Sequence, residues 1–156
     1  MNMEMPQVTE HHRKLSFLSG KWTAEETMYP SPWDPQGGKA AGRIESTVGM
    51  DGFFVVSDYV QERGGQVSYR GHGVYGYDAT ENCYTMHWFD SIGCVPPSPA
   101  RGRFSGDSLT FEQRNPMGHS RYIYTLRGDG KYYFKIENSQ DGKQWVTFMD
   151  AEYRRV

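Results

Sequence analysis

The amino-acid sequence predicts an all-β protein, an antiparallel sandwich or barrel of about ten strands with one short helix at its N-terminus. The first observation is composition, because aromatic residues make up 15% of the chain and 18 residues are glycine. Aromatic rings favour strands, and glycine favours tight turns. The second is spacing: after residue 20, turn signals recur at short intervals and separate short segments rich in Val, Thr, Tyr, Phe and Trp.

The helix is expected over about residues 9–18, where Thr9 can cap the segment "EHHRKLSFLSG". Leu15 and Leu18 are three residues apart and give the helix one apolar edge. Gly20 provides a stop signal. Strands then occupy about residues 20–155, so the whole chain, 1–156, is predicted to form a single domain.

Turns and strands alternate along the rest of the chain, as short strands joined by hairpin turns do in antiparallel sheets. The turn signals include "SPWDPQGG" (31–38), "GMDG" (49–52), "ERGGQ" (62–66), "DATEN" (78–82), "GCVPPSPARG" (93–102), "SGDS" (105–108), "NPMG" (115–118), "RGDG" (127–130) and "SQDGK" (139–143). The segments between them include "FFVVSDYV", "YTMHWFD", "LTFEQR", "RYIYTL", "YYFKIEN" and "WVTFMDAEYRR".

Charge and composition exclude several classes of partner. The net charge is -2 and no basic run occurs, so a nucleic-acid partner is not expected. The first residues, "MNMEMPQVTEHHRK", contain no apolar segment of the kind found in secretory signals, and no stretch approaches the roughly 20 apolar residues of a membrane helix. We therefore expect a cytoplasmic protein with no membrane association, in which Cys83 and Cys94 are reduced thiols.

Three glycines, Gly71, Gly73 and Gly76, match the pattern G-x-G-x-x-G of dinucleotide-binding loops. Such a loop must connect a strand to a helix, because the phosphates bind at the helix N-terminus. Here a turn, "YDATEN", and a strand, "CYTMHWF", follow instead, so no nucleotide site is predicted. We expect the glycines to let a strand bend or approach its neighbour closely.

The hairpin through "DATEN" predicts one face of the barrel wall. If residue 77 faces residue 83, the pairs continue as Val74–Met86, His72–Trp88 and Arg70–Asp90. That face would carry apolar rings around one guanidinium, one imidazole and one carboxylate. A slip of one residue in the loop would change every pair.

The hairpin through "RGDG" predicts that Tyr132, Phe134 and Ile136 point inward, since these apolar residues alternate with polar ones. Their expected partners on the preceding strand are Arg121, Ile123 and Thr125. Arg121 would then point inward and either pair with an internal carboxylate, such as Asp90 or Glu26, or bind an anionic ligand.

The histidines raise the question of a metal site. His72, His87, Asp90 and His119 are of the residue types that ligate metals. The predicted alternation places His72 and His87 on opposite faces of the sheet. We therefore predict no metal site.

The start and end of the chain resemble the lipocalins and other calycins. A short N-terminal helix is followed by "SGKW", then by antiparallel strands, and "EYRR" comes near the end. The resemblance implies an up-and-down barrel in which Gly20 and Trp22 open the first strand and Arg154 or Arg155 packs over the Trp22 ring. This contact would close one end of the barrel.

A second resemblance covers nearly the whole chain. "HRKLSFLSGKW", "GHGVYGYD", "YTMHWFDS", "SGDSLTFEQRNPMG" and "YYFKIENSQDGKQW" look like a bacterial family catalogued as a domain of unknown function, number fifteen seventy-nine. That family implies a calycin-like barrel and no established activity. "LSGKW" also resembles nitrobindin, a haem barrel whose haem ligand is a histidine late in the chain. Here the last histidine is His119, so we predict no haem and no other cofactor.

A barrel of this size can hold one small molecule. We expect an amphipathic or aromatic, anionic ligand, with Arg70, His72 and Arg121 as its polar anchors. The predicted ligand-binding residues are Trp22, Arg70, His72, Met86, Trp88, Asp90, Arg121, Tyr132 and Phe134. One alternative is a non-hydrolytic acid–base enzyme that uses His72 and Asp90 in the same cavity. The other is a structural module with a filled barrel, forming a homodimer through Tyr122, Tyr124 and Phe148.

Overall fold

The computed structural model describes residues 3–115 and 118–156 and shows a closed antiparallel barrel. Residues 116 and 117 of the turn predicted at 115–118 lie outside the described residues. The elements in chain order are α1 (Glu10–Lys14), η1 (Leu15–Leu18), β1 (Gly20–Met28), β2 (Gly38–Gly49), η2 (Met50–Gly52), β3 (Phe54–Arg63), β4 (Gln66–Asp78), β5 (Cys83–Asp90), β6 (Ala100–Ser105), β7 (Ser108–Asn115), β8 (Gly118–Gly128), β9 (Lys131–Ser139) and β10 (Val146–Arg155).

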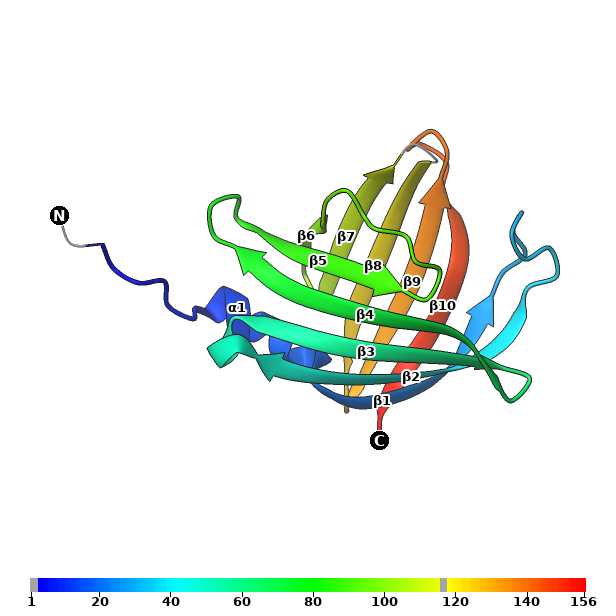
Figure 1. Cartoon of the computed structure of the whole chain (residues 1–156), viewed down its shortest axis with the longest axis horizontal. Coiled ribbons are helices and arrows are strands. Elements are labelled where there is room, and N and C mark those ends of the chain that lie inside the picture. The colour runs from blue at the N-terminus through cyan, green and yellow to red at the C-terminus, as the bar shows by residue number, and fades with distance from the viewer. Residues whose placement is uncertain (1–2, 116–117) are drawn as a thin grey trace.

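Each strand pairs with its neighbour in the sequence, and β1 pairs with β10 to close the barrel. The strands are tilted, so β1 to β4 cross β7 to β10 at a steep angle in Figure 1. The prediction of an up-and-down barrel with a short N-terminal helix is therefore confirmed. Cys83 is buried, Cys94 is exposed, and both are free thiols.

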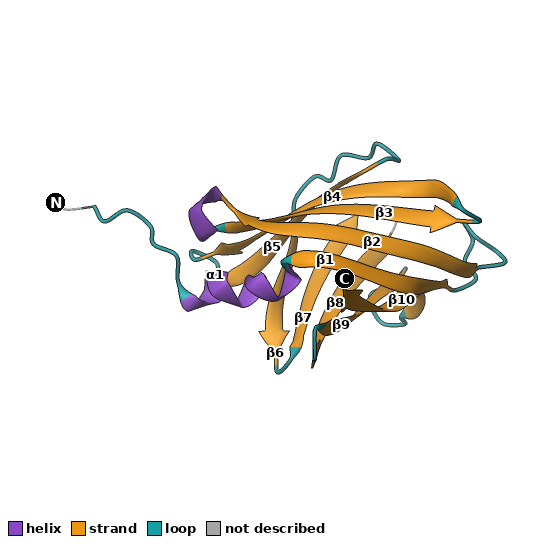
Figure 2. Ribbon diagram, turned by 90° about the horizontal axis from the view of Figure 1, so that it is seen from below, coloured by secondary structure: helices purple, strands orange, loops and turns teal. Residues whose placement is uncertain are grey.

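The helical segment closes one end of the barrel (Figure 2). Leu15 and Leu18 are 1% and 3% exposed and belong to the main hydrophobic core. The indole N–H of Trp22 donates to the carbonyl of Leu18 at 2.9 Å, and the Arg155 guanidinium lies 4.4 Å from the centre of the Trp22 ring. Of the two arginines that the lipocalin resemblance offered, Arg155 therefore makes the contact with Trp22. No helix in the described part of the chain is long and apolar enough to span a membrane.

The pairing of β4 with β5 differs from the prediction by one residue. The loop holds four residues, because Asp78 pairs with Cys83, and His72 therefore pairs with Phe89 rather than with Trp88. Gly71 and Gly73 lie opposite Asp90 and Trp88. The predicted Arg70–Asp90 and Val74–Met86 pairs are wrong for the same reason. The residues on β4 that share a face with Trp88 are glycines and tyrosines, not cations.

The pairing of β8 with β9 also differs by one residue. Tyr122 pairs with Ile136 and Tyr124 with Phe134, because an irregularity between Leu126 and Gly128 shifts the register after the turn. Arg121 pairs with Glu137 instead, and so lies on the outer face. The predicted inward orientation of Arg121 is wrong, and its guanidinium contacts Glu112 and Glu137 rather than Asp90 or Glu26.

Candidate functional site

A cavity of about 400 Å³ lies inside the barrel. It runs from Leu18 at the end closed by the helical segment to Ile92, which is 72% exposed, just after β5 at the opposite end. Aromatic and aliphatic side chains form most of its wall. The lining residues are Leu18, Met28, Ile44, Ser46, Ser57, Tyr59, Gln61, Tyr69, Tyr75, Met86, Trp88, Asp90, Ile92, Tyr122, Tyr124, Tyr132, Phe134, Ile136, Asn138, Phe148, Met149 and Tyr153.

One buried carboxylate lies behind this wall. Glu26 on β1 is 0% exposed and accepts hydrogen bonds from the side chains of Tyr59 (2.6 Å), Gln61 (2.9 Å) and Tyr153. Burial, with the Glu26 charge as a smaller cause, raises the pKa of the Tyr59 and Tyr153 phenols well above the ordinary range. Both phenols therefore remain hydrogen-bond donors at neutral pH.

A second carboxylate, Asp90, faces the cavity at the end of β5. The Tyr69 hydroxyl donates to it at 2.8 Å and in turn accepts the indole N–H of Trp88 at 2.8 Å. Burial is the main cause that raises the pKa of Tyr69, so its hydroxyl remains a donor. A Cβ atom at Gly73 would lie 2.9 Å from the Trp88 ring, and one at Gly71 would overlap it. The glycines of the G-x-G-x-x-G segment thus permit the close approach that the sequence predicted.

The middle of the wall holds two pairs of hydroxyl groups. The hydroxyls of Tyr75 and Tyr124 are 2.7 Å apart, and those of Ser46 and Ser57 are 2.6 Å apart. Burial raises the pKa of Tyr75 to about 12, although the bond from Tyr124 opposes part of that rise. Each pair shares one hydrogen bond, so these groups leave the cavity surface less polar than its composition suggests.

Five of the predicted ligand-binding residues line the cavity. They are Met86, Trp88, Asp90, Tyr132 and Phe134. Trp22 does not line it, but its ring packs edge-on against Tyr132 with the ring centres 4.6 Å apart. Trp22 therefore packs behind the cavity wall and supports Tyr132. Whether any of these side chains binds a ligand remains a prediction.

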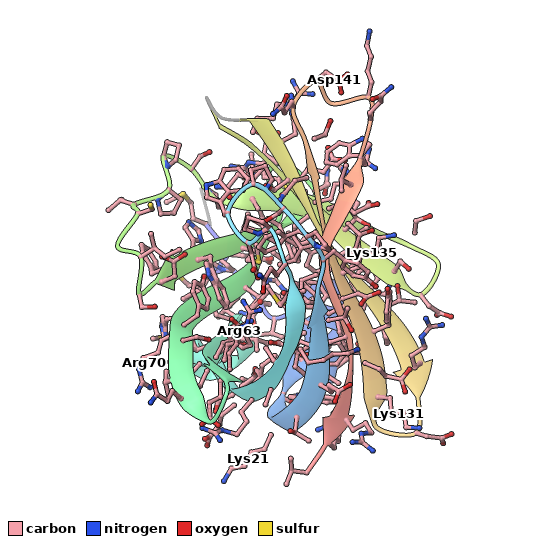
Figure 3. The ribbon with its side chains drawn as sticks, turned by 90° about the vertical axis from the view of Figure 1, so that its right-hand side faces the viewer. Lys21, Arg63, Arg70, Lys131, Lys135 and Asp141 are labelled. Atoms are coloured by element: carbon pink, nitrogen blue, oxygen red, sulfur yellow. The ribbon has the colours of Figure 1, made fainter. Side chains whose placement is uncertain are left out.

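The three predicted cationic anchors lie outside the barrel. Figure 3 shows Arg70 on the outer side of the ribbon, and it is exposed. His72 is exposed and contacts Asp58 with 2.8 Å between Nδ1 and Oδ1. The Arg121 guanidinium lies 3.6 Å from the centre of the Trp145 ring. Since His72 and Asp90 face opposite sides of the sheet, the structure does not bring the predicted acid–base pair together.

The patch predicted for a homodimer is also placed differently. Tyr122, Tyr124 and Phe148 line the cavity instead of forming an outer surface. The cavity itself is inconsistent with a barrel filled by side chains. Within residues 3–115 and 118–156, no cluster of three or more His, Cys, Asp and Glu side chains could hold a metal ion. No histidine is among the described residues that line the cavity, so they do not fit a histidine-ligated haem.

Sequence analysis missed Tyr59, Gln61, Tyr69 and Tyr153 as polar groups of the site, and considered Glu26 only as a partner for Arg121. One signal was present for the Trp88 region: two glycines, two residues apart, on the strand that pairs with a tryptophan make room for its ring. No comparable signal identifies the Glu26 cluster, because its members come from three strands that are distant in the sequence.

The comparisons with known proteins agree with the fold. The family model described as protein of unknown function (DUF1579) matches residues 7–155. The crystal structure of Rv2717c from M. tuberculosis is similar at a TM-score of 0.71 and 12% identity, covering 96% of this chain and 99% of that chain. The S-type phycobiliprotein lyase CPES from Guillardia theta is similar at a TM-score of 0.67 and 10% identity, covering 97% of this chain and 98% of that one. No curated protein matches the chain.

Proposed function

Because the chain belongs to the family of proteins of unknown function DUF1579, we propose its function from the cavity itself: the protein binds a small, largely apolar molecule inside the barrel. The observation that carries this proposal is the cavity of about 400 Å³, which lies within the range of small-molecule sites, roughly 300–1,000 Å³. Its wall combines many aromatic side chains with few polar groups, the usual character of such sites.

The shape of the barrel supports the proposal. One end is closed by the core residues Leu15 and Leu18, whereas Ile92 at the other end is exposed and Phe148 is half-buried. This end offers a ligand a route into the cavity, between the ends of β5 and β9 and the start of β10. One of the structures with a similar fold is a phycobiliprotein lyase, and this likeness supports ligand binding in a barrel of this kind.

Binding of 1-naphthylmethanol, a neutral aromatic alcohol, tests the proposal. Titration calorimetry should detect saturable binding to the wild-type protein. Ile136→Trp on β9 places a larger ring inside the cavity and should weaken binding at least about tenfold. Ile123→Trp is the matched control, because Ile123 lies on the adjacent strand and does not line the cavity. Absence of binding, or equal loss in both variants, would contradict the proposal.

A further inference from the structure

The ionisable groups at the cavity are unbalanced in sign. Asp90 is the one carboxylate on its surface, and no Lys, Arg or His is found among the lining residues that the structure describes. Glu26 lies directly behind Tyr59, Gln61 and Tyr153, which are themselves part of the wall. Among the described residues, one carboxylate thus lies on the cavity wall and a second lies directly behind it, with no cation beside either.

Within residues 3–115 and 118–156, neither carboxylate has a cationic partner. Ten ion pairs occur among the described residues, and Glu26 and Asp90 take part in none of them. Glu26 is fully buried and Asp90 is half-buried, and removing a carboxylate from water without a counter-charge is costly. A cation that enters with the ligand would supply the missing partner.

Asp90 is held in place but is not saturated with hydrogen bonds. Its Oδ2 accepts from the Tyr69 hydroxyl at 2.8 Å, and its Oδ1 accepts from the backbone N–H of Ile92 at 3.1 Å. A carboxylate offers about four acceptor positions, so about two are left for a ligand. The Trp88 indole fixes Tyr69 from its other side, which holds Asp90 in one orientation.

Aromatic rings surround the same end of the cavity. Trp88 and Tyr69 are joined to Asp90 by hydrogen bonds. The Asp90 charge also adds a small contribution to the raised pKa of Tyr122, whose main cause is burial. The faces of such rings attract ammonium groups, most strongly where water is excluded. Carboxylate and ring faces at one place therefore favour the same kind of ligand head.

We propose that the ligand is an amphipathic amine or quaternary ammonium compound, with its cationic group at Asp90 and its apolar body in the aromatic cavity. This inference rests on the proposed function and specifies the ligand class of the same site. An anionic ligand, expected when Arg70, His72 and Arg121 were predicted to point inward, would instead meet Asp90 with no cation beside it.

Three probes with one naphthalene body test this inference on the unaltered protein. They are 1-naphthylmethylamine, 1-naphthylmethanol and 1-naphthylacetate, the anion of 1-naphthylacetic acid. Calorimetry should show the protonated amine binding at least about tenfold more tightly than the acetate, with the alcohol between them. If the alcohol binds but the amine is no tighter than the acetate, the ligand class is wrong and the proposed function stands. If none of the three binds, both proposals fail.

Two variants separate the local effect of Asp90 from net charge. Asp90→Asn should remove the preference for the amine over the acetate. Asp58→Asn changes the net charge equally, but Asp58 lies on the outer face beside His72. It should keep the preference intact. Equal loss in both variants would assign the preference to overall charge and overturn the inference. If Asp90→Asn does not fold, the ranking of the three probes on the unaltered protein still decides.

Discussion

On the outer face of the barrel, charged side chains on neighbouring strands pair with one another, whereas on the inner face the carboxylates are held by neutral donors. Outside, Arg43 contacts Glu62 at 2.8 Å and Arg121 contacts Glu112 at 3.3 Å. Inside, tyrosine hydroxyls and one glutamine amide donate to Glu26, and the Tyr69 hydroxyl donates to Asp90.

This difference shows that the face on which a side chain lies decides its chemistry. An outer ion pair remains in contact with water, so it contributes little to stability, typically about 0–1 kcal/mol. The Glu26 carboxylate is fully buried and has lost water, so its donors become essential to the packing around it, whereas Asp90 is half-buried. The predictions that follow compare the two faces, beginning with the largest expected effect.

High pH should unfold the protein through its inner tyrosines. Burial raises the pKa of Tyr75 to about 12, whereas an unfolded tyrosine ionises near about 10. Below the unfolded pKa the stabilisation is fully present. As pH rises from about 10 towards 12, the unfolded chain releases protons that the folded chain retains, so stability falls. Urea unfolding at increasing pH, followed by tyrosinate absorbance, should show ionisation coupled to unfolding. A constant free energy of unfolding across this range would show that the phenols are not buried.

The packing around Glu26 can be tested at a glycine. A Cβ atom at Gly42 on β2 would lie 2.7 Å from the Glu26 carboxyl carbon and 2.9 Å from the Tyr153 hydroxyl. Gly42→Ala should therefore lower the free energy of unfolding by about 1–3 kcal/mol.

Gly49→Ala on the same strand is the matched control. No atom lies within 4 Å of a Cβ built at Gly49, and its φ of -133° is open to any residue. Its effect in urea unfolding should stay within about 1 kcal/mol and can be stabilising. If both variants lowered the free energy of unfolding by similar amounts, crowding against Glu26 would not be the cause of the loss at Gly42.

The fold was predictable from local signals, whereas most of the site was not. Alternation alone placed Tyr132 and Phe134 inward, and the resemblance to lipocalins around Trp22 identified the closed end. The face on which each polar side chain lies depends on the register of the strand pairing. A four-residue loop between Asp78 and Cys83, and an irregularity after Leu126, each shift the pairing by one residue. A shift of one residue in the register moves every side chain of a strand to the other face.

The smallest effect is expected at Arg121, which local patterning placed inside and the structure places outside. Its guanidinium lies over the Trp145 ring at 3.6 Å and contacts Glu112 and Glu137, and all of these groups are partly exposed. Arg121→Met should lower the free energy of unfolding by no more than about 1 kcal/mol. The affinity for each naphthyl probe should be unchanged within error, the acetate included. Sharply weaker acetate binding in this variant would mean that the guanidinium reaches the ligand, and that the inner face is not the anion-repelling surface on which the proposed ligand class depends.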